Sequence, residues 1–286
     1  MIVARTIEEV RDAVSAARKA GAKTAFVPTM GFLHQGHLSL IQVARKSGAD
    51  FIVVSIFVNP KQFGPGEDFA RYPRNEEGDG ALLEKEKVDL LFMPAVDVMY
   101  PPGAMTTVSV GSVARPLEGE RRPGHFDGVA VVVLKLFNIV QPDIAVFGRK
   151  DAQQCAVIDR MVRDLNVPVQ LIFGATIREH DSLAMSSRNS YLSARERELA
   201  PVLHRALRAG EEAVKHGIED VDEVERLMHR IAAETSGVAA DYLALVDPAT
   251  FQRPADFRRD LLVAGALRIG RTRLIDNIFI DRKLIP

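Results

Sequence analysis

The feature that most constrains the fold is a repeated alternation of short apolar runs with helical patterns. Such runs occur at Thr24–Pro28, Phe51–Val58, Leu90–Met93, Asp143–Phe147 and Val169–Phe173. They are too short for helices and do not alternate in polarity, which is typical of parallel strands covered on both faces. Ligands of such sheets bind beyond the carboxyl ends of the strands, where the strand order reverses.

Helical patterns separate these runs. Thr6 and Glu9 form a capping box that predicts an N-terminal amphipathic helix. Further helical patterns lie at Leu38–Ala44, Gly80–Glu86, Val129–Val140 and Ala152–Leu165. The alternation predicts an α/β protein built on a Rossmann-like, doubly wound parallel sheet.

The pattern changes after about Ile177. A capping box at Ser193–Glu196 predicts one helix with an apolar stripe through Leu207, and a second helix is expected near Val221–Ala233. Three later runs read as strands of a smaller α+β unit: Asp241–Val246, Leu261–Leu267 and Thr272–Ile275. We therefore expect a Rossmann-like ligand-binding domain over 1–176 and a smaller C-terminal α+β domain over 177–286 that closes over the active site.

Composition excludes several classes of protein. The chain is 47% hydrophobic and 26% charged, so it has enough apolar surface to fold. A formal net charge of −1 argues against a protein that follows nucleic-acid backbones. No apolar run reaches the ~20 residues needed to span a bilayer. The single cysteine, Cys155, cannot form an intrachain disulfide, and we expect a cytoplasmic protein.

The strongest chemical signal is the segment 28–37. A strand ends at Pro28, a loop containing Gly31 follows, and a helix is expected to begin around His34–His37, with Gly36 between the two histidines. The histidines lie on one face of a helix start, where unpaired N–H groups favour an anion, so the segment suits a polyphosphate. Two other interpretations are a pair of surface histidines on a helix cap and a zinc site, although a third ligand is not apparent nearby.

The His34-Gln35-Gly36-His37 segment is similar to the His-x-Gly-His signature of the nucleotidyltransferase superfamily. Within that superfamily, the whole chain resembles the pantoate–β-alanine ligase family. The matching motifs follow in one order: Pro28–Gly31, Ser55–Pro60, Gln62-Phe63, Arg71–Arg74, Arg122–Phe126, Gln141–Asp143, Lys150-Asp151, Gln153-Gln154, Met185–Asn189 and Arg273–Asn277.

The resemblance implies an ATP-dependent ligase. Pantoate attacks the α-phosphorus of ATP, pyrophosphate leaves, and β-alanine then displaces AMP from the pantoyl adenylate to give pantothenate for coenzyme A synthesis. Members of the family use Mg²⁺ and form homodimers, and they act on small molecules without a nucleic acid or membrane partner.

The resemblance also implies an ATP-binding set, and the residue types suit phosphate neutralisation without a protein nucleophile. We expect catalytic roles for His34, His37, Lys150, Ser187 and Arg188. The full ATP-binding set is Met30, Gly31, Phe32, Leu33, His34, Gln35, Gly36, His37, Gly148, Arg149, Lys150, Asp151, Ile177, Met185, Ser186, Ser187 and Arg188. Arg149 departs from the family, so its side chain is given no role. Two alternatives involve no ligand. The segment around Lys150 is then a solvated loop with a helix cap at Asp151, and Ser186–Arg188 is a capped polar turn.

Gln62 and Gln154 are the expected pantoate-binding residues. A primary amide both donates and accepts hydrogen bonds, so it can hold hydroxyls and a carboxylate without quenching the nucleophile's charge. His125 either borders the pocket or forms a structural turn. Asp79, Asp89 and Asp127 are candidates to approach Mg²⁺, but no metal ligand is assigned because Mg²⁺ on ATP needs few protein ligands.

Three alternatives stay open at this point. Another nucleotidyltransferase, such as a cytidylyltransferase, would share the histidines but lack the Gln62–Gln154 pair. An RNA-binding role would require basic and aromatic clusters that the C-terminal part lacks. A non-catalytic descendant would have lost members of the set His34, His37, Lys150 and Arg188, all of which are present.

Overall fold

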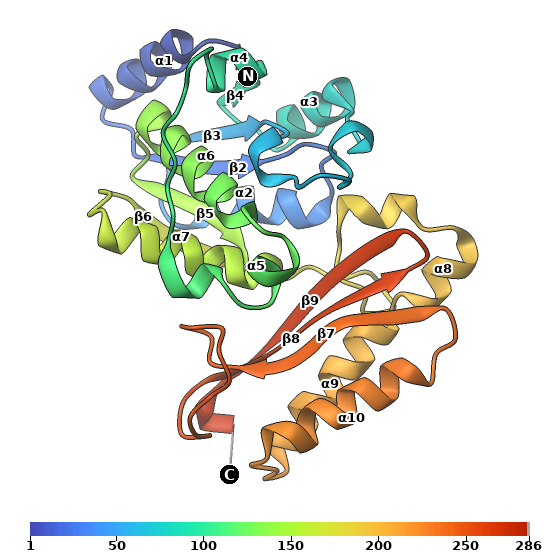
Figure 1. Ribbon diagram of the computed structural model, residues 1–286. Helices are drawn as coiled ribbons and strands as arrows, with labels where there is room; N and C mark the ends of the chain where they lie inside the picture. Colours follow the sequence, from blue (N-terminus) through green and yellow to red (C-terminus); the bar gives the residue numbers. More distant parts are fainter. Residues whose placement is uncertain (285–286) are drawn as a thin grey trace.

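The computed structural model describes residues 1–284 and contains two sheets, which Figure 1 shows in the upper and lower halves of the molecule. The first sheet is six-stranded and wholly parallel, with the order β1-β4-β3-β2-β5-β6. Its strands are β1 (Ile2–Ala4), β2 (Thr24–Thr29), β3 (Phe51–Ile56), β4 (Leu90–Phe92), β5 (Ile144–Gly148) and β6 (Gln170–Gly174). The doubly wound sheet is thus confirmed, and β1 is an additional short edge strand that the sequence analysis missed.

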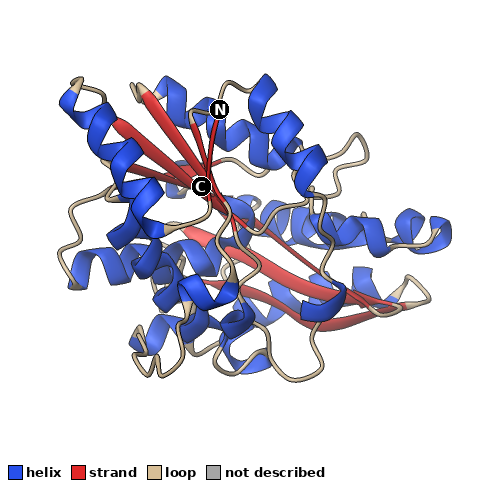
Figure 2. Cartoon of the chain, turned by 90° about the horizontal axis from the view of Figure 1, so that it is seen from above, coloured by secondary structure: helices blue, strands red, loops and turns tan. Residues whose placement is uncertain are grey.

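Helices cover both faces of this sheet, as the turned view of Figure 2 also shows. On one face lie α1 (Ile7–Lys19), α6 (His125–Val140) and α7 (Ala152–Asp164), and on the other α2 (Gln35–Lys46) and α3 (Glu76–Lys85). Successive side chains of β2 point to opposite faces of the sheet. Phe26 packs toward α6, whereas Ala25 and Val27 pack toward α2. Burying one such large side chain contributes about 1.5–3 kcal/mol, which explains the continuous apolar runs.

The strand order reverses between β2 and β5. From β2 the chain moves through β3 to β4 on one side, and later fills the other side with β5 and β6. The carboxyl end of β2 leads into segment 30–34 and then α2, and the carboxyl end of β5 leads into the 3-10 turn η4 (Arg149–Asp151) and then α7. Both predicted phosphate-binding segments therefore emerge at the point where a doubly wound sheet binds its ligand.

The second sheet is antiparallel and contains β7 (Val238–Val246), β8 (Leu261–Ile269) and β9 (Thr272–Ile280) in that order. The helices α9 (Val202–Lys215) and α10 (Val221–Ala233) pack on one face. The other face packs on the N-terminal part of the chain, where Leu262 and Ala264 meet Phe126 and Val157. The smaller α+β unit is confirmed; the boundary at 176/177 stays a prediction.

One helix expectation is wrong in detail. The stripe that begins at Ser193 is divided into α8 (Ala194–Leu199) and α9, because Pro201 stands between them. Proline has no N–H to donate and its ring crowds the carbonyl four residues earlier, so the first helix stops before it. Strand β9 also extends beyond Ile275, since it pairs with β8 along its whole length, as far as Ile280 opposite Leu261.

Shorter helical turns complete the structure: η1 (Pro60–Gln62), η2 (Phe69–Arg71), α4 (Val96–Met99), η3 (Gly111–Ala114), α5 (Glu118–Arg121), η5 (Ser187–Tyr191) and η6 (Arg282–Leu284). Within residues 1–284, none of the helices has the length and apolar character required to cross a membrane.

Candidate active site

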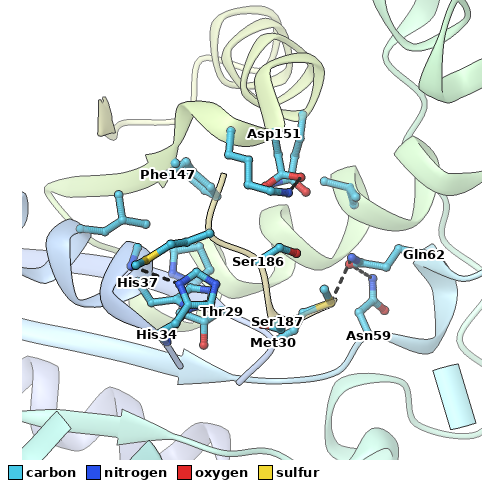
Figure 3. Close-up of a pocket in the computed structure, with 18 of the residues that line it drawn as sticks. Thr29, Met30, His34, His37, Asn59, Gln62, Phe147, Asp151, Ser186 and Ser187 are labelled. Carbon is cyan, nitrogen blue, oxygen red and sulfur yellow. Dashed lines mark hydrogen bonds and ion pairs between the residues drawn. The ribbon is translucent and has the colours of Figure 1, made fainter. Parts of the chain in front are cut away.

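A cavity of about 200 Å³ lies at the switch point of the first sheet. Figure 3 shows that its side chains come from the ends of β2 and β5, from η1 and from η5. Most of the predicted site residues line it: Met30, His34, Gly36, His37, Gln62, Gly148, Lys150, Asp151, Gln154, Ile177, Met185, Ser186, Ser187 and Arg188. The predicted residues Gly31, Phe32, Leu33, Gln35 and Arg149 do not line it.

The two histidines form the start of α2. The Nδ1 atom of His34, the N-cap residue, accepts a hydrogen bond from the Gly36 amide at 3.1 Å. The His34 amide in turn donates to Nδ1 of His37 at 3.3 Å, so the pair forms a reciprocal capping box. Because both Nδ1 atoms accept, each neutral ring carries its proton on Nε2. Each histidine thus retains one N–H donor for a ligand.

Gly36 is required by this arrangement. A Cβ atom at Gly36 would lie 2.8 Å from Cε1 of His34, which is closer than atoms in contact allow. The glycine therefore makes room for the His34 ring as it caps the helix.

Both histidines are neutral near pH 7. Burial, helped by the Lys150 charge, lowers the pKa of His34 to about 4. Burial and the neighbouring His34 lower the pKa of His37 to about 3. Neutral imidazoles suit this position, since they donate hydrogen bonds to phosphate oxygens without adding charges that repel Lys150.

Asp79 holds the loop before α2 in place. Its carboxylate, on α3, accepts hydrogen bonds from the Phe32 and Leu33 amides, both at 2.7 Å. Asp79 is almost completely buried, and burial raises its pKa despite these two donors. Since the amides of Phe32 and Leu33 are satisfied by Asp79, these two residues shape the loop. Asp79 was considered as a metal neighbour from the sequence, but its oxygens are engaged here.

The cationic side of the cavity starts at η4. Lys150 lies 3.9 Å from the Asp151 carboxylate, measured between Nζ and Oδ1. Asp151 precedes α7 but its side chain makes no cap hydrogen bond, so the carboxylate is available to a ligand. The side chain of Arg149 is exposed and does not line the cavity.

The turn η5 carries the second set of predicted phosphate donors. The Ser187 hydroxyl donates to the Phe32 carbonyl at 3.2 Å, which joins η5 to the loop before α2. Nε and Nη2 of Arg188 donate to the two carboxylate oxygens of Asp68 at 2.8 and 2.9 Å. Nη1 of Arg188 makes no hydrogen bond within residues 1–284, and the side chain lines the cavity. One edge of the guanidinium is therefore held while the other remains for an anion.

Amide side chains also line the cavity. Asn59 Nδ2 donates to Gln62 Oε1 at 3.0 Å and to the Gly128 carbonyl at 3.0 Å. A Cβ atom at Gly128 would lie 2.1 Å from the Lys61 carbonyl oxygen, so only glycine lets α6 approach η1 this closely. Gln154 makes no hydrogen bond within the described part of the chain. Gln62 is thus preset, and Gln154 is free for a ligand.

The cavity also has an apolar wall. It consists of Phe57, Val129, Val132, Val133, Leu136 and Phe147. His125 lies outside this cavity; its ring is buried and contacts the Gln62 carbonyl through Nδ1 at 2.8 Å. Of the two interpretations offered for His125, the geometry favours the structural one.

Sequence reasoning missed several residues that the structure brings to the site, among them Asn59, Asp68 and Tyr72. Asn59 stood inside one of the quoted motifs, and Tyr72 in another, but neither carries a spacing signal of its own. Asp68 pairs with a residue more than a hundred positions away, which a sequence pattern does not reveal.

The side chains at the cavity provide few ligands for a metal ion. Within residues 1–284, no group of three or more His, Cys, Asp or Glu side chains has the geometry to hold an ion. Of the three aspartates considered from the sequence, Asp79 holds the two loop amides, Asp89 accepts from the Ile52 amide at 2.8 Å, and none lines the cavity. Among the described residues, Asp151 is the only carboxylate that lines it. This arrangement fits Mg²⁺ only as an ion carried mainly by phosphate oxygens.

A doubly wound sheet with a His-x-Gly-His cap and two cations at its switch point defines the class as a nucleotidyltransferase-type enzyme. The sequence model of the family described as pantoate-beta-alanine ligase matches residues 2–279. A pantothenate synthetase of Herpetosiphon aurantiacus is 52% identical over 279 residues, covering 97% of this chain and 99% of the relative.

Comparison with solved structures leads to the same family. The pantothenate synthetase of Thermus thermophilus has a TM-score of 0.93 and 47% identity, with full coverage of both chains. The pantoate-beta-alanine ligase of Francisella tularensis, complexed with beta-gamma ATP and beta-alanine, has a TM-score of 0.81 and 34% identity, with 97% of each chain covered. The chain belongs to the pantoate–β-alanine ligase family.

Proposed function

We propose that this chain uses ATP to condense pantoate with β-alanine, through a pantoyl adenylate, and releases AMP and pyrophosphate. The observation that carries the proposal is a single cavity lined by cationic and imidazole side chains that suit phosphates, and also by amides and apolar side chains. Pantoate has hydroxyls and a carboxylate, which match the amides, and a branched apolar centre, which matches the apolar side chains.

In the first step, a pantoate carboxylate oxygen attacks the α-phosphorus, and the bond to pyrophosphate breaks. No protein nucleophile is required, so catalysis rests on position and charge. Lys150 and the free edge of Arg188 neutralise the charge that develops on pyrophosphate, and the Nε2 donors of His34 and His37 add hydrogen bonds. Mg²⁺ bound to the phosphates would supply further charge neutralisation, and Asp151 would be the carboxylate that approaches it.

In the second step, the neutral amine of β-alanine attacks the acyl carbon. A C–N bond forms, the bond between that carbon and the AMP oxygen breaks, and the amine proton passes to water. Gln62 and Gln154 hold the pantoyl group through both steps. Ile177 contacts the adenine at the far end of the cavity.

Family membership leads us to propose three further properties: a homodimer, a requirement for Mg²⁺, and a place in cytoplasmic coenzyme A synthesis. Closure of the C-terminal unit over the nucleotide is part of the same proposal.

The proposal is tested by pantoate-dependent release of pyrophosphate from ATP and Mg²⁺. Without β-alanine we expect one equivalent per active site, because the adenylate stays bound. With β-alanine, release becomes continuous. Release that depends on another acid, and not on pantoate, would retain the nucleotide site and reject the substrate.

A further inference from the structure

We propose that Asn277, on the second sheet, is a positioning residue for Lys150. This inference rests on the proposed function, and it assigns a catalytic contribution to a strand that has no side chain in the phosphate cavity. Asn277 Nδ2 donates to the backbone carbonyls of both Arg149 and Lys150, each at 2.9 Å. These residues form η4, the turn that presents the Lys150 ammonium to the cavity.

The turn η4 needs such support. It is three residues long, it joins β5 to α7, and no side-chain cap bond is made at the start of either η4 or α7. A lysine ammonium acts as a point charge on a flexible stem, so its position depends on the backbone that carries it. The two hydrogen bonds from Asn277 constrain that backbone from outside the first sheet.

Asn277 is itself rigidly placed. Its strand, β9, is at the edge of the second sheet and is paired with β8, where Asn277 lies opposite Ala264. The backbone N–H of Asn277 donates a hydrogen bond to Asp276 Oδ1 at 2.8 Å. Asp276 is buried and receives two hydrogen bonds from Arg178, at 2.6 and 2.9 Å.

Arg178 extends the same support to the other end of the nucleotide site. It directly follows Ile177, and the Met185 amide donates to the Ile177 carbonyl at 2.9 Å, which closes a hairpin that leads to Ser186. Two successive residues of β9 thus hold two separate parts of the site: Asp276 holds the hairpin, and Asn277 holds the lysine turn. The second sheet sets the distance between them.

The test is a double-mutant cycle with Lys150, measured as the rate of the first pyrophosphate release in a single turnover. Asn277→Ala should slow this step about tenfold, as expected for the loss of two hydrogen bonds, while the pantoate concentration needed for half-maximal rate stays the same. In a Lys150→Ala background, Asn277→Ala should have no further effect, because the group that it positions is gone. Equal effects in both backgrounds would overturn the proposal.

Two variants separate positioning from general stability. Asn277→Asp keeps the shape of the side chain but removes its two N–H donors. It should therefore slow the first step at least as much as Asn277→Ala. If the alanine variant does not fold, Asn277→Asp replaces it in the double-mutant cycle. Glu225→Ala removes, from α10, the acceptor of a 3.0 Å hydrogen bond that the backbone N–H of Leu245 on β7 donates, and it should lower stability without slowing the step. An equal loss of rate in Glu225→Ala would show that Asn277 acts only through stability. A wild-type chain that releases no pyrophosphate with pantoate would instead reject the proposed function.

Discussion

The two sheets of this molecule have different roles. The first sheet is parallel and apolar on both faces, and the segments that follow the carboxyl ends of β2 and β5 carry His37 and Lys150. The second is antiparallel, and its polar residues bind protein groups: Arg273 of β9 joins Glu118 of α5 with two hydrogen bonds of 2.7 Å. The proposed chemistry is therefore concentrated at one switch point, while the second sheet holds the parts that surround it.

The largest expected effect concerns the attachment of the second sheet. Glu118 is buried, and its carboxylate also accepts from the Tyr242 hydroxyl at 2.8 Å. Although burial opposes ionisation, the Arg273 hydrogen bonds and charge hold the pKa of Glu118 below its usual value. Removing one partner of a buried pair costs about 3–5 kcal/mol. Glu118→Ala should therefore lower the free energy of unfolding in urea by about that amount.

Glu120 provides the matched control, because it is exposed on the same short helix. Glu120→Ala should change the free energy of unfolding by less than about 0.5 kcal/mol. Equal losses in the two variants would show that the buried pair is not what holds the sheet.

The next effect concerns the first sheet. His37→Ala removes an N–H donor aimed at the phosphate side of the cavity, and loss of one such donor costs roughly 3–4 kcal/mol in the transition state. We expect kcat to fall about 100- to 1000-fold while the KM for pantoate changes little. The exposed His229 on α10 is the control, and His229→Ala should leave kcat unchanged. Full turnover in His37→Ala would remove this residue from the mechanism.

A smaller effect is expected on the amide side. Gln154→Ala should raise the KM for pantoate about tenfold, because a hydrogen bond to a charged group contributes about 1.5–3 kcal/mol. Steady-state kinetics with pantoate and ATP varied in turn will measure this. Gln42→Ala, on the exposed face of α2, should change neither constant. A rise confined to the KM for ATP would move Gln154 to the nucleotide.

The effect that is smallest near neutral pH is a pH dependence of stability. The pKa of His37 is lowered to about 3 in the folded chain, whereas an unfolded histidine titrates near 6.5. Between these values the unfolded state binds more protons, so stability falls as the pH is lowered from about 6.5 toward 4. His37→Asn should reduce this slope, and His229→Asn should not. Identical slopes in the wild type and His37→Asn would contradict the assigned burial of His37.

Local patterns predicted much of the fold. The capping boxes at Thr6 and Ser193 both exist, and five of the six parallel strands follow the apolar runs. The strand β1 was missed because three residues give too short a signal, and the break at Pro201 was missed because the apolar stripe continues across it. At β1, packing in the folded sheet outweighed the weak local pattern. At Pro201, the backbone restriction of proline outweighed the apolar periodicity.

The site was predictable where chemistry and a local turn coincide, as at His34–His37 and Lys150. It was not predictable where the partner is distant in sequence. Asp79 holds the Phe32 amide, Asp68 holds Arg188, and Asn277 holds the lysine turn only because the folded chain brings them together. The quoted motifs contained Asn277 but gave no reason for it.

The proposed mechanism depends above all on activation of pantoate at the α-phosphorus, in the cavity of the first sheet. The most direct measurement uses pantoate labelled with ¹⁸O in its carboxylate, with mass analysis of the products. The mechanism predicts one labelled oxygen in AMP, because the bridging oxygen stays with phosphorus when the amine attacks the acyl carbon. Label in inorganic phosphate, with ADP as the nucleotide product, would contradict it.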